Sequence, residues 1–497
     1  MNTLFAKLKQ RAQFKASELA LKSAQQQVSN LQLLDRVDHL ADQLEKTKLS
    51  CVALFMDNSI EWIVADLAAM KLGLTLIPIP LFFSQQQREH LIHDAGIQAV
   101  ITQQTFIENF TYTRQHILPG MQLLVLDNSS QPDISQLKNV AKITYTSGST
   151  GNPKGVCLSA NNLQEVTQAL ADSISGLGIR HHLCVMPLAT LLENIAGVYV
   201  PLLMGNSIQV EPLSVLGFTQ SSGFDEQRFM RCVAKTEPSS IILLPQLLTS
   251  LIHLKQRFPD GFHSLKFIAV GGGKSAQASL EKAHALQLPV YEGYGLSECA
   301  SVVSLNNPKH HKPGSVGKVL PHTRVRISHE GEIIVAGQAM LGYLGQSDLT
   351  KASQNTEIHT GDLGHIDRDG FLYISGRKKN LIVSSFGRNI SPEWVESEFQ
   401  QAESIDQVAI FGDAKPWLSA IINPAANSTN RDIETFIQQC NERLPDYAQI
   451  KSWLKGSEVF SAQNQQLTQN GRLRRDVIYI RYQHQLNDLY DRYELYK

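Results

Sequence analysis

A dense run of hydroxyl groups, glycines and one lysine lies between residues 146 and 155. It follows residues 143–146, whose β-branched and aromatic side chains are typical of a strand. Glycines let a ligand approach the backbone closely, and successive N–H groups in such a turn form a concave anion site. A lysine adds a point charge suited to phosphate. We therefore expect a phosphate-binding loop, with Thr146, Ser147, Gly148, Ser149, Thr150, Gly151 and Lys154 as its residues.

The spacing of this loop differs from that of GTPases, because the pattern G-x-x-x-x-G-K-[ST] is absent. A flexible Gly/Ser loop without a ligand is the alternative, which the ordered hydroxyls, glycines and lysine disfavour. The run T-S-G-S-T-G-N-P-K-G resembles the phosphate loop of the adenylate-forming superfamily, which includes acyl-CoA synthetases, adenylation domains and luciferases. The superfamily pattern is T-S-G-[ST]-[ST]-G-x-P-K-G, and every fixed position is matched.

A second motif, Y-G-L-S-E at residues 294–298, resembles the superfamily pattern Y-G-x-[ST]-E. The Tyr294 ring is suited to lie against adenine, and the Ser297 hydroxyl to meet the α-phosphate. The resemblance implies that Glu298 holds Mg²⁺ together with Thr146, because Mg²⁺ prefers oxygen ligands. Nearby candidates for nucleotide binding are Glu292, Gly293 and Gly295, together with Gly272 and Gly273, which resemble the glycine pair on the adenine side.

The tripeptide Thr360-Gly361-Asp362 resembles the superfamily's T-G-D, whose carboxylate accepts hydrogen bonds from both ribose hydroxyls. Alone the signal is weak, since Gly-Asp is an ordinary turn dipeptide. Its position before Gly376-Arg377 strengthens it, because Arg377 resembles a second ribose contact. An exposed arginine at a domain junction is the alternative.

Two motifs near the C-terminus bear on the reaction. Residues 385–392, S-F-G-R-N-I-S-P, resemble the long-chain fatty acyl branch, so Gly387 and Arg388 are candidate coenzyme A contacts.

The superfamily ends in L-T-x-x-x-K, whose lysine reaches the carboxylate and α-phosphate. Here Arg472 occupies that place, and an arginine is a planar fork rather than a compact charge. Arg472 is the expected catalytic group together with Lys154 and Glu298.

The length of 497 residues predicts two or more domains. With 45 basic and 46 acidic residues, the chain lacks the charge footprint of nucleic-acid binding. Six scattered cysteines without a C-x-x-C pair favour neither disulfides nor zinc and fit the reducing cytoplasm. The first 21 residues do not resemble a signal peptide, and no apolar run reaches the ~20 residues of a membrane span. Peripheral membrane contact stays open.

Strand and helix patterns alternate between residues 51 and 102 and again between 241 and 295, which predicts a layered α/β domain with parallel strands. Three glycine-bearing loops follow strands there, and ligands bind beyond the carboxyl ends of such strands. We expect surface helices over residues 1–50 and a small β subdomain within 313–376. The predicted boundaries are an adenylation domain at 1–376, a hinge at 377–380 and a small mobile α+β domain at 381–497.

The resemblance implies an AMP-forming acid–thiol ligase that uses ATP, Mg²⁺ and coenzyme A. The expected substrate is a carboxylic acid, namely a medium- or long-chain fatty acid, which passes through an acyl-adenylate to a thioester. One alternative delivers the acyl group to the phosphopantetheine thiol of an acyl carrier protein. Another, motivated by Arg472, is a catalytically silent nucleotide-binding homologue. Thr190 stands where many members carry a histidine or aromatic residue near the acyl site.

Overall fold

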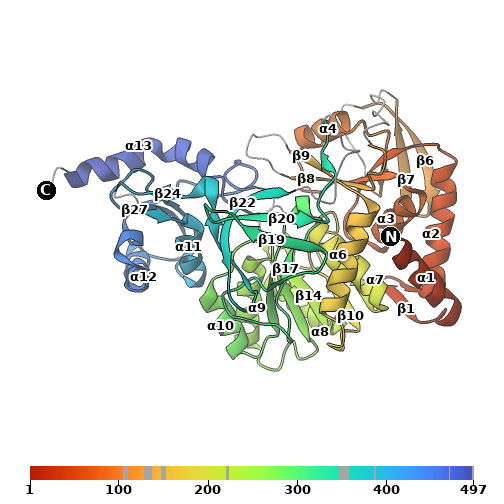
Figure 1. The fold of residues 1–497 in the computed structure, drawn as a ribbon, viewed down its shortest axis with the longest axis horizontal. Helices are drawn as coiled ribbons and strands as arrows, with labels where there is room; N and C mark the ends of the chain where they lie inside the picture. The colour runs from red at the N-terminus through yellow and green to blue at the C-terminus, as the bar shows by residue number, and fades with distance from the viewer. Residues whose placement is uncertain are drawn as a thin grey trace.

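The computed structural model describes residues 1–103, 110–127, 137–146, 153–219, 223–345, 357–385, 388–468 and 471–494. A large domain carries the N-terminus and a small domain carries the C-terminus (Figure 1). The large domain is α/β and the small one α+β, so the predicted fold class is confirmed.

Two sheets form the large domain, and each has a parallel centre with antiparallel edges. The first runs β18 (Lys318–Val319), β17 (Ser304–Leu305), β16 (Val290–Tyr294), β15 (Phe267–Val270), β14 (Ser240–Leu243), β10 (His181–Cys184), β11 (Ser207–Val210), β1 (Leu19–Lys22), β2 (Gln27–Ser29). The second runs β21 (Gly342–Tyr343), β9 (Lys154–Leu158), β8 (Lys142–Thr146), β4 (Thr75–Pro78), β3 (Cys51–Phe55), β5 (Ala99–Thr102), β7 (Met121–Leu126), β6 (Tyr112–Leu118). Their carboxyl ends offer the binding edges expected of α/β sheets.

Helices pack between and around the two sheets, and their apolar faces join the sheets in three buried clusters. They are α1 (Asn2–Phe14), α2 (Asn30–Glu45), α3 (Ile60–Leu72), α4 (Gln85–Asp94), α6 (Ala160–Ser173), the π-helix η1 (Glu193–Tyr199), α7 (Val200–Met204), α8 (Glu226–Thr236), α9 (Pro245–Arg257) and α10 (Gln277–Ala285). Helix α3 shows how the sequence sets these limits. The Ser59 hydroxyl caps its first turn by accepting from the Trp62 amide, and Gly73 ends it with a φ of 72°.

The N-terminal prediction was incomplete. Residues 1–50 do contain two helices, but their apolar faces are buried, and Leu33, Leu40 and Leu44 are fully enclosed. Residues 19–29 between them form strands β1 and β2, which extend the edge of the first sheet. These strands are too short to show a period in the sequence, so only the pairing of β1 with β11 and of β2 with β1 reveals them.

A third sheet, the predicted small β subdomain, joins the large domain to the small one. It runs β19 (Thr323–Ile327), β20 (Glu332–Gly337), β22 (Ile358–Ile366), β23 (Leu372–Arg377). The small domain follows with β24 (Ile382–Val383), β25 (Asn389–Ile390), α11 (Pro392–Ser397), β26 (Ile405–Phe411), β27 (Leu418–Pro424), α12 (Asn430–Arg443), β28 (Ile450–Lys455) and α13 (Arg475–Glu494). It has its own apolar clusters, which explains why it forms a separate unit.

A buried ion pair fixes the strand that leads into the phosphate loop. Lys142, at the start of β8, places its Nζ 2.6 Å from Oδ1 of Asp66 on α3, and both side chains are almost fully enclosed. Tyr199 and Asn194 of η1 complete the cluster by hydrogen bonding to Lys142 and Asp66. Burial lowers the pKa of Lys142, while Asp66 acts in the opposite direction. The cluster therefore ties β8, α3 and η1 together.

We expect Lys142→Met to lower the free energy of unfolding by about 3–5 kcal/mol, because it leaves the Asp66 carboxylate buried and unpaired. Urea unfolding followed by circular dichroism measures the change. The control is Lys71→Met, which breaks a 2.7 Å pair with Asp38 whose side chains are 31% and 42% exposed. That variant should lose no more than about 1 kcal/mol. Equal urea midpoints for the two variants would contradict the larger stabilisation expected from the buried Lys142–Asp66 pair.

Candidate active site

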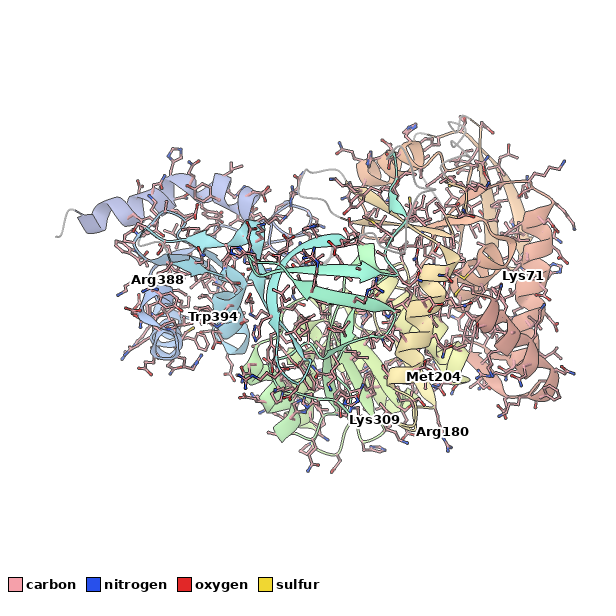
Figure 2. All side chains as sticks on the ribbon, in the orientation of Figure 1. Lys71, Arg180, Met204, Lys309, Arg388 and Trp394 are labelled. Atoms are coloured by element: carbon pink, nitrogen blue, oxygen red, sulfur yellow. The ribbon has the colours of Figure 1, made fainter. Side chains whose placement is uncertain are left out.

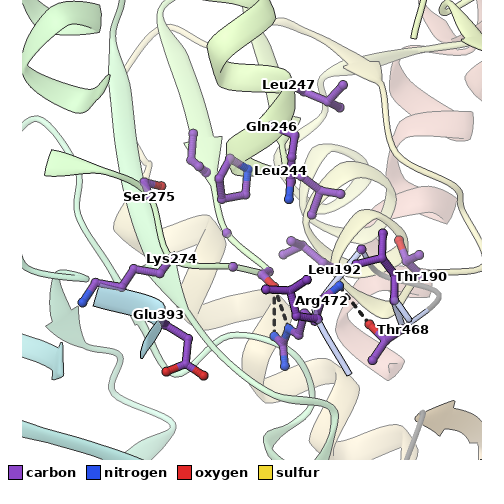
Figure 3. A pocket seen from close by; sticks show the side chains of 18 of the residues that line it. Thr190, Leu192, Leu244, Gln246, Leu247, Lys274, Ser275, Glu393, Thr468 and Arg472 are labelled. Carbon is purple, nitrogen blue, oxygen red and sulfur yellow. Dashed lines mark hydrogen bonds between the residues drawn. The ribbon is translucent and has the colours of Figure 1, made fainter. Parts of the chain in front are cut away.

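A cleft of about 3600 Å³ lies where the two domains meet, and both contribute to its walls. The large domain supplies strand ends and the loops after β15 and β16, and the small domain supplies Glu393 of α11 and Arg472. Figure 3 shows part of this cleft, with Arg472 reaching toward the large domain. The cleft thus gathers segments that lie far apart in the sequence.

Thr146 and Lys154 stand opposite each other as a cross-strand pair of β8 and β9, and both line the cleft. The loop between them, with Ser147, Gly148, Ser149, Thr150 and Gly151, lies outside the described residues. Lys154 was expected to close the loop, and it is the first residue of the returning strand β9. An ordered strand on each side therefore fixes both ends of the loop.

Glu298 and Lys154 are joined through Tyr343. The Tyr343 hydroxyl donates a 2.8 Å hydrogen bond to Oε1 of Glu298, and Nζ of Lys154 lies 5.6 Å from the centroid of the Tyr343 ring. Tyr343 was not predicted from the sequence, because a Gly-Tyr dipeptide in a glycine-containing run carries no specific signal. Its position was visible only once β21 paired with β9.

The donor set near Glu298 fits Mg²⁺. Among the described residues, no hydrogen bond or ion pair engages the second carboxylate oxygen of Glu298, which lines the cleft. The Thr146 hydroxyl lines the same cleft. A carboxylate and a hydroxyl are oxygen ligands of the type that Mg²⁺ takes while keeping several waters. The two predicted metal ligands, Thr146 and Glu298, are therefore compatible with this ion.

Asp362, Arg377 and Tyr294 form one hydrogen-bonded cluster. Asp362 and Arg377 are cross-strand partners of β22 and β23, with Nε of Arg377 2.7 Å from Oδ1 of Asp362. The Tyr294 hydroxyl donates to Oδ2 of the same carboxylate at 2.7 Å. The Asp362 side chain is only 6% exposed, so its orientation is fixed by these partners. Three residues predicted from three separate stretches of the sequence thus meet at the Asp362 carboxylate.

The loop after β15 brings its backbone into the cleft. Gly272 has a φ of 82°, and a Cβ there would lie 2.8 Å from Leu244. Arg472 donates from Nε and Nη2 to the Gly272 carbonyl, at 3.1 and 2.9 Å (Figure 3). Asp362, Tyr294 and Glu298 lie within electrostatic reach of its guanidinium. Arg472 therefore stands in the same cleft as the predicted nucleotide residues.

Arg388 does not reach this cleft. Its guanidinium lies over the Tyr447 ring, 5.9 Å from the centroid, and it is not among the described lining residues. Figure 2 places Arg388 on the side of the small domain turned away from the large domain. Gly387 lies outside the described residues. The structure thus brings Arg472, but not Arg388, to the predicted nucleotide residues.

Glu292 and Lys274 line the cleft near the small domain, and burial shifts the pKa of each side chain. Burial raises the pKa of Glu292 to about 7, while hydrogen bonding from Ser275 and the charge of Lys274 act against this. Burial lowers the pKa of Lys274, which Glu393, Glu292 and Glu398 partly offset. Gly273, Gly293, Gly295 and Ser297 also line this cleft.

Family models match both parts of the chain. Residues 8–344 match the family described as AMP-binding enzyme, and residues 379–494 match the AMP-binding enzyme C-terminal domain. The chain therefore belongs to the AMP-binding enzymes of the adenylate-forming superfamily. This confirms the predicted superfamily and the predicted class of AMP-forming ligase.

Individual relatives refine the comparison. The 2-succinylbenzoate–CoA ligase of Bacillus licheniformis is 26% identical over 473 residues, covering 90% of this chain and 94% of the relative. The anthranilate CoA ligase AuaEII, in complex with anthranoyl-AMP, has a TM-score of 0.78 at 18% identity and 96% coverage of both chains. The O-succinylbenzoate coenzyme A synthetase of Bacillus subtilis, in complex with ATP and magnesium ion, has a TM-score of 0.71 at 23% identity, covering 95% and 98%.

These names do not support the predicted long-chain fatty acyl branch. The proteins reported above are named as ligases of 2-succinylbenzoate or anthranilate, whereas the prediction depended on a short motif, S-F-G-R-N-I-S-P. Of the described residues in this stretch of the small domain, none lines the cleft, so the motif carries little information about the acid. The described helices include none long and apolar enough to cross a membrane.

Proposed function

We propose that this enzyme activates a carboxylic acid with ATP and transfers the acyl group to the thiol of coenzyme A. The arrangement of Lys154, Glu298, Asp362 and Arg472 around one cleft carries this proposal. Relatives that use coenzyme A support the acceptor. In the first step a carboxylate oxygen attacks the α-phosphorus and pyrophosphate leaves. In the second, the thiol sulfur attacks the acyl carbon, and the bond to AMP breaks.

Each residue has a stated part in the first step. Arg472 and Lys154 supply positive charge where two anions, carboxylate and triphosphate, must approach each other. Asp362, held by Tyr294 and Arg377, accepts the ribose hydroxyls and so fixes the position of the α-phosphorus. Mg²⁺, when bound by Glu298 and Thr146, neutralises charge on the phosphates. Ser297 and the loop glycines supply further donors close to the nucleotide.

The small domain is proposed to turn about residues 377–380 between the two steps. These residues connect β23 to the small domain, and Lys378–Asn380 form a single 3₁₀ turn. Asn380 donates to Glu393 of α11, so the present arrangement is held at the hinge itself. Because Arg472 faces the cleft while Arg388 points away, the arrangement suits adenylation. Rotation would exchange these two residues for the thiol step.

The acid is proposed to have an uncharged, apolar body, as in a medium- or long-chain fatty acid. Part of the cleft lining, here called the apolar wall, comes from α6, η1, α7, β15 and β17. Its members are Leu170, Ile174, Ala196, Val200, Met204, Phe267 and Leu305. Thr190, Leu192 and Leu244 also line the cleft and lie around Arg472 (Figure 3).

The alternative substrate is an aromatic acid such as that of the relatives, which carries a second carboxylate. Of the described residues that line the cleft from α6, η1 and α7, none is lysine or arginine. The buried His182 lines the cleft near these elements, but it already contacts Glu193 and Ser240. Burying an unpaired carboxylate is costly, so a monoacid fits this wall better.

A pyrophosphate-release screen tests the substrate. We expect kcat/KM to rise about fourfold per added methylene from butanoate onward, because each buried CH₂ contributes about 0.8 kcal/mol. The rise should stop when the space along the apolar wall is filled. Benzoate and 2-succinylbenzoate are the comparison acids, and each acid is run with and without coenzyme A. A flat response to chain length with strong turnover of 2-succinylbenzoate would replace the fatty acid by the aromatic one. Release without thioester formation would shift the acceptor to a carrier protein.

A further inference from the structure

The segment from Met340 to Leu344 holds two parts of the cleft at once. Its backbone amides donate to carbonyls of strand β9, which follows the phosphate loop: Leu341 to Cys157 and Leu344 to Gly155, each at 2.8 Å. The amide of Met340 donates to the Glu298 carbonyl at 2.7 Å. The distance between Lys154 and Glu298 is therefore set by this one segment.

The Tyr343 side chain also connects the side chains of Glu298 and Lys154. Its hydroxyl donates to Oε1 of Glu298 at 2.8 Å, and its ring faces the ammonium of Lys154 at 5.6 Å. A phenol hydroxyl that donates to one carboxylate oxygen fixes the rotation of that carboxylate. The other oxygen is then presented to the cleft in one direction.

We propose that Tyr343 is a positioning residue for both halves of the phosphate site: its hydroxyl orients the Glu298 carboxylate toward the metal ion, and its ring holds the Lys154 ammonium. This inference rests on the proposed function for the identity of the metal and the nucleotide. Partners of metal ligands are worth about 10- to 100-fold in metal affinity or activity, because they fix the ligand's orientation. A purely structural tether would instead change stability and leave metal affinity unaltered.

The two roles can be separated by substitution. Tyr343→Phe keeps the ring over Lys154 and removes only the hydroxyl. Tyr343→Leu removes both. Tyr373→Phe is the matched control, since the Tyr373 hydroxyl also donates to a carboxylate, Oδ2 of Asp367 at 3.4 Å. That pair lies on the hairpin of β22 and β23, and Tyr373 is not among the described residues lining the cleft.

The hydroxyl is tested by electron paramagnetic resonance titration of Mn²⁺ onto the enzyme with a non-hydrolysable ATP analogue. Tyr343→Phe should raise the Mn²⁺ dissociation constant about tenfold or more, and Tyr373→Phe should leave it unchanged. Wild-type Mn²⁺ affinity in Tyr343→Phe would overturn the orienting role. This readout needs no turnover, so it stands even where the acid is wrongly assigned. Failure of the proposed function would appear separately, as absent pyrophosphate release by the wild type.

The ring is tested by the affinity of the same analogue without metal, measured by calorimetry. Tyr343→Leu should weaken binding about two- to fivefold relative to Tyr343→Phe, because the lysine loses its aromatic contact. Equal nucleotide affinity in the two variants would remove the ring from the proposal. Thermal melting of all three variants identifies a general loss of structure, in which case Tyr343→Phe alone, the smaller change, decides the outcome.

Discussion

Replacing Lys154 or Glu298 by alanine is expected to lower the rate of adenylation about 100-fold or more. Each variant removes one group that faces the phosphates, and deleting a single transition-state donor typically costs this much. Both residues line the described cleft, and Tyr343 joins them. Pyrophosphate release in a single turnover measures the effect, with the acid chosen from the chain-length screen.

Lys71→Ala is the matched control, because Lys71 forms an exposed pair with Asp38 on the helices of the large domain. It should release pyrophosphate at the wild-type rate. Near wild-type release by folded Lys154→Ala or Glu298→Ala would mean that the residue lacks its proposed role, and failure of both expectations would remove the phosphate site from the account.

Replacing Arg472 by alanine is expected to impair adenylation far more than the thiol step. The guanidinium reaches into the cleft, where it donates to the Gly272 carbonyl and lies within electrostatic reach of Asp362 and Glu298. Arg472→Lys should keep part of the rate, because a lysine retains the charge but loses the two-pronged contact. Pyrophosphate release measures the first step, and thioester yield from supplied acyl-adenylate measures the second.

Arg443→Ala serves as control within the small domain, since Arg443 pairs with Glu398 at 3.4 Å and is not among the described lining residues. It should leave both half-reactions at wild-type rates. Should Arg472→Ala adenylate normally, the charge needed at the carboxylate would come from another group. Equal losses in both half-reactions would contradict the assignment of Arg472 to the first step.

The parts of the site that could be predicted from the sequence are residues in short motifs next to strand ends. Asp362 and Arg377 illustrate this, since both were named from motifs and prove to be cross-strand partners. Elements set by long-range pairing were not predictable. Strands β1 and β2 are short: β1 pairs with β11, which lies far away along the chain, and β2 in turn pairs with β1. Tyr343 likewise becomes a partner of Glu298 only because β21 pairs with β9.

The substrate was the least predictable feature, for a physical reason. Phosphate, ribose and metal contacts require particular donors at fixed spacing, so they leave motifs in the sequence. An apolar wall requires only side chains of suitable size, and Ala196, Val200 and Met204 read like any buried helix. The resemblance around Gly387 and Arg388 therefore could not replace the shape of the cleft, and Arg388 itself lies away from it.

The most direct test of the central claim follows an oxygen atom. A carboxylate that attacks the α-phosphorus leaves one of its oxygens on AMP after the thiol has taken the acyl group. With an acid labelled with ¹⁸O in both carboxylate oxygens, ATP, Mg²⁺ and coenzyme A, we predict AMP carrying a single ¹⁸O, detected by mass spectrometry, together with acyl-CoA. AMP without label, or formation of ADP and labelled phosphate, would contradict an acyl-adenylate route.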